Sequence, residues 1–294
     1  MSQSLGTILT AMVTPFAADE SVDHEKLAAL AEFLLENGSD GLVVAGTTGE
    51  SPTLSDDEKL EMFRTVVAAV GGRAPVVAGT GSNETRHSVD LTRAAEACGV
   101  DAVLVVVPYY NKPPERGLIA HFRAVAAATS LPVILYNIPG RCVVNLSPEA
   151  LAELAKVENI VAVKQANPDL SETDRLMGLC DLAVYAGNDD MLVDVMARGG
   201  AGGICVASHV VGQRMAEVAR LCRQGDLEAA RAEDAALHAL YKALFVAANP
   251  IPVKAALNLL GHEVGGLRLP LVPATSEEEA LVAAELRRLG LLGA

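Results

Sequence analysis

The chain has 294 residues, a formal net charge of −14 and 51% hydrophobic residues. The negative charge argues against a nucleic-acid-binding surface and against binding to an anionic membrane. Apolar runs are interrupted before the roughly 18 residues that a membrane span needs, and Met1–Gly6 shows no basic and apolar signal segment, so we expect a cytoplasmic protein with a sizeable core.

Short apolar runs alternate with amphipathic stretches along the first 224 residues. Strands are expected at Thr7–Val13, Gly41–Ala45, Pro75–Ala78, Ala102–Val107, Pro132–Tyr136, Ile160–Lys164, Leu182–Ala186 and Gly203–Ala207. Helices are expected at Asp23–Asn37, Ser55–Val70, Glu84–Cys98, Arg116–Thr129, Ser147–Lys156, Ser171–Cys180, Asp190–Arg198 and Val211–Arg223. The strand runs are nearly all apolar, which indicates parallel strands that are covered on both faces.

This order of elements predicts an α/β protein with a (β/α)8 TIM barrel. A doubly wound open sheet is the competing fold, but it usually carries a glycine-rich turn after the first strand, where this chain has Thr14-Pro15-Phe16. After Gln224 only helices are expected, at Leu227–Val246, Ile251–Leu260 and Ser276–Leu289. We therefore expect a catalytic barrel over residues 1–224 and a C-terminal helical appendage over residues 225–294.

The active site of such a barrel lies at the C-terminal ends of its strands. The residues expected there lie in Gly46–Ser51, Pro108–Pro114, Tyr136–Arg141, Lys164, Gly187-Asn188 and Ile204–Ser208. Hydroxyls, phenols, one guanidinium and one amine are therefore expected on a single rim.

Lys164 is the only lysine that ends an expected barrel strand. The others lie in amphipathic helices, where a solvated position is expected, in a Pro-rich loop or in the appendage: Lys26, Lys59, Lys156, Lys242, Lys112 and Lys254. Lysine is rarely buried without a reason, and a desolvated amine can attack a carbonyl substrate and form a Schiff base. The alternative is that the strand has ended and Lys164 points to solvent.

Four neighbouring positions fit this chemistry. Tyr136 ends the preceding strand and could move protons during Schiff-base formation; the alternative is a strand-end aromatic with its hydroxyl in water. Thr47 and Thr48 could bind a carboxylate through hydroxyls and backbone N–H groups, although this sequence also suits an ordinary loop. Arg141 offers a bidentate carboxylate clamp, with a surface cation as the alternative.

Other chemistries are less well supported by the sequence. The six histidines are isolated and the five cysteines are scattered without a CxxC pair, so neither a metal site nor a disulfide framework is favoured. Neither a GxSxG elbow nor a Walker loop occurs.

Together these motifs resemble the dihydrodipicolinate synthase (4-hydroxy-tetrahydrodipicolinate synthase) family of pyruvate-dependent class I aldolases. The resemblance rests on GTTGES from Gly46, PYYNKP from Pro108, YNIPGR from Tyr136, Lys164, and NPIPVK from Asn249. It implies a lyase of lysine and diaminopimelate biosynthesis that condenses pyruvate with L-aspartate 4-semialdehyde. It implies no metal or organic cofactor, and a homotetramer built as a dimer of dimers.

The resemblance also implies roles for single residues. Lys164 resembles the Schiff-base residue, Tyr136 the general acid/base, and Thr47 and Tyr110 its proton-relay partners, with Tyr110 supplied by a neighbouring subunit. The implied substrate-binding residues are Thr48, Ile204 and Gly187 for pyruvate and Arg141 for the aldehyde's carboxylate.

Two departures from the family pattern affect these expectations. Gln165 follows the lysine where the family often has a glutamate, which removes a charge beside it. At the family's inhibitory lysine site, the matching positions are Asp56, Lys59 and His87, while Ser51, Asn83 and Tyr109 still fit. A cation at Lys59 and the missing carboxylate at His87 predict weak or absent feedback inhibition by lysine.

Two other functions stay open at this point. One is a different pyruvate-dependent aldolase that acts on a sugar acid or on 4-hydroxy-2-oxoglutarate; Arg141 favours a short carboxylated aldehyde instead. The other is a non-catalytic barrel that binds a keto acid, which would not need the proton relay of Tyr136, Thr47 and Tyr110.

Overall fold

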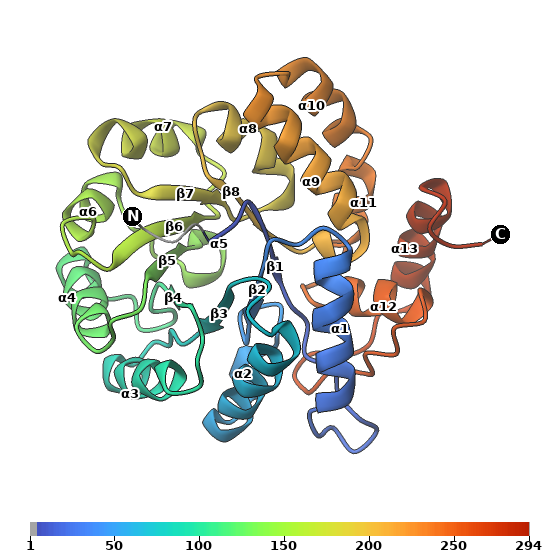
Figure 1. Ribbon diagram of the computed structural model, residues 1–294, viewed down its shortest axis with the longest axis horizontal. Helices are drawn as coiled ribbons and strands as arrows, with labels where there is room; N and C mark the ends of the chain where they lie inside the picture. The colour runs from blue at the N-terminus through green and yellow to red at the C-terminus, as the bar shows by residue number, and fades with distance from the viewer. Residues whose placement is uncertain (1–4, 294) are drawn as a thin grey trace.

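The computed structural model describes residues 5–293, and its eight strands close into a parallel barrel in chain order (Figure 1). The strands are β1 Ile8–Ala11, β2 Gly41–Val44, β3 Val76–Gly79, β4 Ala102–Val106, β5 Val133–Asn137, β6 Ile160–Gln165, β7 Ala183–Ala186 and β8 Gly202–Cys205. The expected (β/α)8 barrel, with helices following its last unit, is therefore confirmed.

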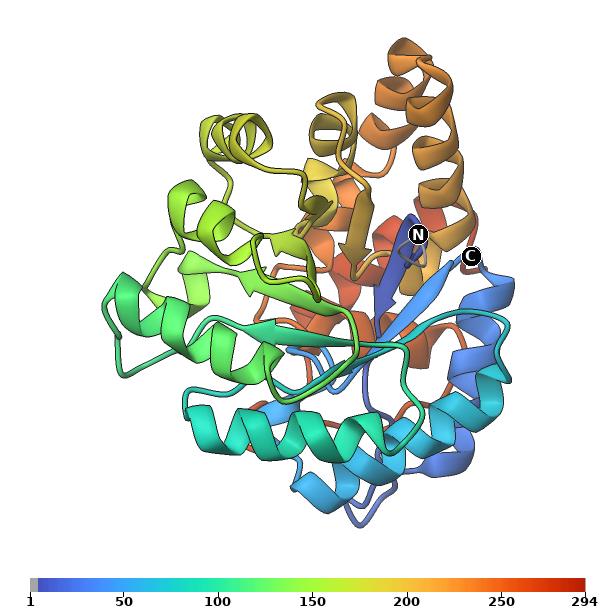
Figure 2. The ribbon, with the colours of Figure 1, turned by 60° about the vertical axis from the view of Figure 1, so that its left-hand side comes forward.

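Helices surround the barrel, as Figure 2 shows from a second direction. Those of the barrel are α1 His24–Glu36, α2 Asp56–Val70, α3 Thr85–Glu96, α4 Glu115–Ala126, α5 Pro139–Cys142, α6 Pro148–Leu154, α7 Leu170–Leu179, α8 Leu192–Ala197 and α9 Ser208–Gln224. Those that follow are α10 Leu227–Ala235, α11 His238–Ala243, α12 Ile251–Leu259 and α13 Ser276–Arg288. Two short 3₁₀ helices are η1 Ser51–Thr53 and η2 Asp189–Met191.

The core has two parts because successive strand residues point to opposite faces of the sheet. Alternate residues such as Leu104, Ile134 and Ala162 fill the inside of the barrel. Their neighbours, such as Val163, pack against the surrounding helices. On β6 this alternation directs Lys164 inward and Gln165 outward.

The prediction of one helix over 227–246 is wrong. The chain turns at Ala236-Leu237, where the Leu237 N–H bonds to the Asp234 carbonyl at 2.8 Å, three residues back. This turn lets α10 pack on α8 and α9, while α11 packs on α13. The short helix α5 was not expected, and most other bounds differ by only a few residues.

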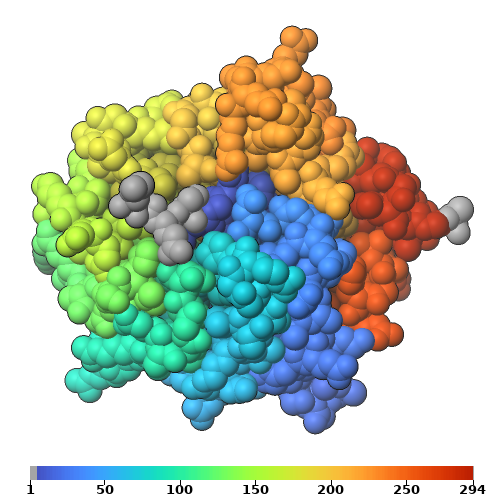
Figure 3. Space-filling view, viewed as in Figure 1, coloured from blue at the N-terminus to red at the C-terminus, as the bar shows by residue number. Residues whose placement is uncertain are grey.

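The C-terminal helices cover one side of the barrel and form a continuous surface with it (Figure 3). The connection from α12 to α13 returns to the barrel, where the Phe16 N–H bonds to the Val264 carbonyl at 3.1 Å. Farther along this connection, Pro270 and Leu271 contribute to a cavity at the barrel rim. Within residues 5–293, no helix is long and apolar enough to cross a membrane.

Candidate active site

A cavity of about 330 Å³ opens at the C-terminal ends of β2 to β5. Its walls contain Thr47, Tyr136 and Arg141, which the sequence analysis assigned to the catalytic chemistry, together with Asn249 of the appendage. Apolar and backbone groups from Gly79, Leu104, Val106 and Ile138 line much of the rest. Hydroxyl groups, a phenol and a guanidinium therefore line one cavity at the rim.

Lys164 lies beside this cavity. It pairs in register with Tyr136 on β5 and with Tyr185 on β7, so the three side chains share one level of the barrel interior. Lys164 is 5% exposed, and its Nζ lies 4.5 Å from the centroid of the Tyr136 ring. The alternative of a solvated strand-end lysine is therefore wrong, because the strand continues to Gln165 and directs the amine inward.

The two threonines after β2 lie close to the appendage. Thr48 is 3% exposed, and its hydroxyl accepts a hydrogen bond from Asn249 Nδ2 at 2.9 Å. An amide nitrogen can only donate, so the proton of the Thr48 hydroxyl is free for another acceptor. The Asn249 Oδ1 atom is buried and has no partner within residues 5–293.

Arg141 lies in α5, directly after β5, with an exposed side chain on the cavity wall. Its Nη2 donates to the Asn249 carbonyl at 3.4 Å, which is a long bond. Most of its N–H groups are therefore available for a planar anion at the mouth of the cavity.

Gly187 directly follows β7, and Ile204 lies in β8. The Gly187 N–H bonds to the Gln165 carbonyl at 2.8 Å, and a Cβ at position 187 would meet the Ala166 Cβ at 2.6 Å, so only glycine fits this close approach. Ile204 is fully buried in the barrel interior. Neither residue contributes to the wall of the rim cavity.

The turn that follows Ile204 is held by Asp189. Its carboxylate accepts the backbone N–H groups of Val206 and Ala207 at 2.8 and 2.9 Å. Burial raises the pKa of Asp189, whereas these two bonds and the positive charge of Lys164 act in the opposite direction.

Tyr110 is separated from this cluster within the single chain. Its side chain is 88% exposed, its φ of 73° is unusual for a non-glycine residue, and it does not line the cavity. The neighbouring Asn111 fixes the loop by donating to the Asn83 carbonyl at 2.8 Å.

Gln165 is fully buried on the helix-facing side of β6, away from the amine of Lys164. Its Oε1 accepts hydrogen bonds from Asn137 Nδ2 at 2.9 Å and from the Asn167 N–H at 3.3 Å. Its Nε2 has no partner within residues 5–293. The departure from the family pattern therefore alters the layer behind the site.

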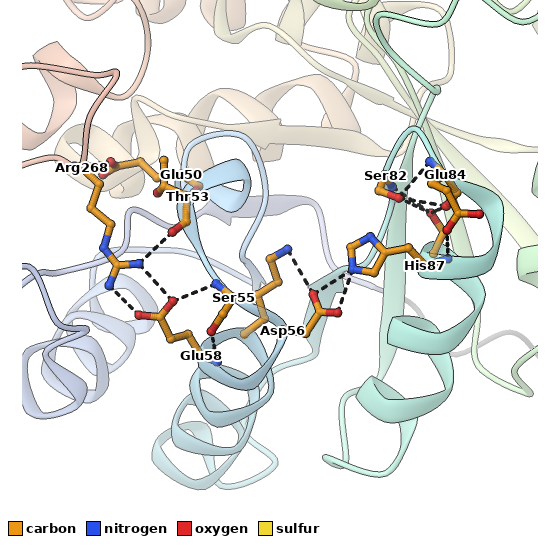
Figure 4. A network of polar contacts seen from close by, with 11 residues as sticks. Glu50, Thr53, Ser55, Asp56, Glu58, Ser82, Glu84, His87 and Arg268 are labelled. Atoms are coloured by element: carbon orange, nitrogen blue, oxygen red, sulfur yellow. Dashed lines mark hydrogen bonds and ion pairs between the residues drawn. The ribbon is translucent and has the colours of Figure 1, made fainter.

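Asp56, Lys59 and His87 form a cluster of their own, part of which is seen in Figure 4. The Asp56 carboxylate lies 2.8 Å from His87 Nε2 and 3.7 Å from Lys59 Nζ. Lys59 is only 7% exposed, so the expectation of a solvated side chain is wrong. Burial lowers the pKa of Lys59, partly opposed by Asp56.

Sequence reasoning assigned no role to Asn249, Glu50 or Lys254, although the motifs that carry the resemblance contain all three. Lys254 is 1% exposed, and its Nζ lies 2.8 Å from the fully buried Glu50 carboxylate. A lysine within the apolar run from Ile251 to Leu257 was the available signal. Within residues 5–293, no group of three or more His, Cys, Asp or Glu side chains is arranged to hold a metal ion.

Comparison with known proteins agrees with the motifs. The sequence profile of the Dihydrodipicolinate synthetase family matches residues 4–289. The 4-hydroxy-tetrahydrodipicolinate synthase of Moorella thermoacetica is 51% identical over 98% of this chain and 99% of its own.

Solved structures agree as well. The dihydrodipicolinate synthase of Cyanidioschyzon merolae with lysine bound superposes with a TM-score of 0.97 at 43% identity, over 99% of this chain and 100% of its own. A monomeric dihydrodipicolinate synthase variant superposes with a TM-score of 0.96 at 42% identity, over 98% of both chains. Because the profile and these relatives span nearly the whole chain, the chain belongs to the dihydrodipicolinate synthetase family.

Proposed function

We propose that this chain is a lyase that condenses pyruvate with L-aspartate 4-semialdehyde to form 4-hydroxy-tetrahydrodipicolinate. The observation that carries the proposal is the inward-facing Lys164 amine, 4.5 Å from the ring of Tyr136 at the edge of a rim cavity. A buried amine next to a phenol is the arrangement that Schiff-base chemistry needs.

In the proposed reaction, the neutral amine of Lys164 attacks the keto carbon of pyruvate. A carbinolamine forms, and its hydroxyl leaves as water after it gains a proton, which Tyr136 supplies as the general acid. Loss of a methyl proton from the resulting imine gives an enamine. Thr47 and Tyr110 relay protons between Tyr136 and solvent.

The enamine carbon then attacks the aldehyde carbon, and the new alkoxide takes up a proton. The amino group of the aldehyde substrate displaces Lys164 from the imine carbon, which closes the ring and frees the lysine for another cycle. In this assignment the hydroxyl of Thr48 and the backbone at Gly187 and Ile204 contact pyruvate. Arg141 binds the carboxylate of the aldehyde, in keeping with its unused donors at the cavity mouth.

Borohydride trapping tests this assignment directly. Reduction in the presence of pyruvate converts the imine into a stable secondary amine, which peptide mass mapping locates. We expect one adduct, on Lys164, that is lost in Lys164→Ala and kept in Lys26→Ala. An adduct elsewhere, or none, would refute the mechanism. If pyruvate is trapped on Lys164 but untreated enzyme is inactive with aspartate semialdehyde in a coupled assay, the choice of aldehyde would be refuted.

We also propose that the enzyme works as a homotetramer in the cytoplasm. The 88% exposure of Tyr110 supports a role in a neighbouring subunit, because within a single chain this phenol does not line the cavity. The five cysteines, all of them free, are in keeping with a reducing compartment. Sedimentation analysis of wild type and Tyr110→Phe tests the assembly: a fully active monomer would contradict it.

Feedback inhibition by lysine is proposed to be weak or absent. Asp56 is already paired with His87 and Lys59, and a second ammonium group next to Lys59 is unfavourable. The Asp56 carboxylate is therefore not free to bind an added amino acid.

A further inference from the structure

The loop that carries Thr47 and Thr48 has an unusual backbone. Ala45 and Glu50, which flank the two threonines, have φ values of 55° and 56°. These left-handed conformations are unfavourable for residues with a side chain, and they persist only where the surroundings hold them.

One contact is the buried ion pair between Glu50 and Lys254. Both side chains are almost inaccessible, at 0% and 1%, and the residues lie 204 positions apart in the chain. The second carboxylate oxygen of Glu50 accepts the backbone N–H of Arg268 at 3.1 Å. Lys254 also donates to the Gly266 carbonyl and lies 4.3 Å from the centroid of the Phe16 ring.

A second contact joins the appendage to the same loop. Asn249, five residues before Lys254, donates to the Thr48 hydroxyl at 2.9 Å. The loop is therefore held at the Glu50 end by a charge pair and at Thr48 by an amide, both from the segment that contains α12. A Cβ at Gly79 on β3 would collide with the Ala45 carbonyl, so the start of the loop also has little room to shift.

A buried ion pair is a weak explanation of stability, since apolar residues of similar size often serve as well. It does, however, define where two segments lie relative to each other, because each charge must keep its partner. Here it links the site loop to the appendage.

Building on the proposed function, we propose that Glu50 and Lys254 are positioning residues that hold the Thr47-Thr48 loop in its pyruvate-binding geometry. The helical appendage is then a working part of the pyruvate site. Neither residue touches the reacting atoms, and both act through the loop.

Lys254→Met tests the proposal, with Arg268→Met as the matched control. Arg268 forms a partly buried ion pair between appendage and barrel, to Glu58 at 2.5 Å (Figure 4), and its substitution leaves the backbone N–H that bonds to Glu50. We expect kcat/KM for pyruvate to fall about 10- to 100-fold in Lys254→Met, and to stay within about threefold of wild type in Arg268→Met. The KM of the aldehyde should change less than about threefold in both.

The double variant Glu50→Gln/Lys254→Met removes both charges. It replaces Lys254→Met as the test variant if Lys254→Met does not fold. It should show the same selective loss for pyruvate, whereas Lys254→Arg should recover most of the activity because it keeps the charge. A folded Lys254→Met or double variant with wild-type kcat/KM for pyruvate would overturn the proposal. Equal losses in Arg268→Met would also overturn it, since the effect would then be general.

Hydrogen exchange separates this proposal from the proposed function, because it requires no activity. The amides of residues 46–51 should exchange at least about tenfold faster in Lys254→Met than in wild type or Arg268→Met. Unchanged exchange would refute the anchoring even in an active enzyme. Failure of wild type to trap pyruvate would instead refute the reaction and leave the exchange result standing.

Discussion

Tyr136→Phe gives the sharpest test of the proton-transfer assignment. The substitution removes one hydroxyl and keeps the ring that packs against Lys164, whose Nζ lies 4.5 Å from the ring centroid. The side chain is 5% exposed and lines the cavity, and its hydroxyl makes no hydrogen bond within residues 5–293. The change therefore removes an acid without removing a structural contact.

The expected magnitudes follow from this geometry. With no hydrogen bond lost, the free energy of unfolding should change by less than about 1 kcal/mol. Loss of general acid/base catalysis should lower kcat by roughly 10²- to 10⁴-fold, which corresponds to about 3–5 kcal/mol of activation free energy. The KM of pyruvate should change little, because the hydroxyl acts on the transition states of proton transfer.

Tyr185→Phe is the matched control. Tyr185 pairs in register with Lys164 on its other side, but its hydroxyl donates to the Gly6 carbonyl at 2.9 Å, toward the opposite end of the barrel. Steady-state kinetics and urea unfolding of both variants are the assays. We expect Tyr185→Phe to keep kcat within about threefold of wild type. A Tyr136→Phe enzyme as fast as Tyr185→Phe would remove Tyr136 from its role.

Arg141→Ala should raise the KM of the aldehyde about 10- to 100-fold and leave the KM of pyruvate nearly unchanged, since a bidentate clamp is lost at the cavity mouth; equal changes for both substrates would contradict the clamp. Millimolar lysine should neither inhibit the enzyme nor produce heat in calorimetry, because Asp56 is already paired with Lys59 and His87; tight, inhibitory binding would refute this. Burial lowers the pKa of His209 to about 4, below its usual 6.5, so the unfolded state binds more protons as the pH falls below about 6.5. His209 should thus destabilise the fold by about 2 kcal/mol between pH 7 and pH 5, and its NMR signal should stay that of a neutral ring at pH 5; titration near 6.5 would contradict its burial.

The sequence alone determined the barrel and much of the site. Eight apolar runs followed by amphipathic helices predict the fold because this pattern is local and repeats along the chain. Once the fold is known, the ends of its parallel strands must meet at one rim, which is why Lys164, Tyr136, Thr47 and Arg141 could be placed there. The helix over 227–246 was mispredicted because packing against two different partners ended it, which no local pattern records.

Only the tertiary structure decided how that rim is held. Successive residues of a strand point to opposite faces of the sheet, so in the closed barrel Lys164 points inward and Gln165 points outward, away from the Lys164 amine. Lys59, expected in solvent, is buried beside Asp56, and Lys254 closes an ion pair with Glu50 across 204 positions of chain. Hydrophobic periodicity shows which faces are buried, but not which residue of a distant segment meets a given side chain. Such pairs form only when the chain folds, because they depend on which residues lie close together in three dimensions.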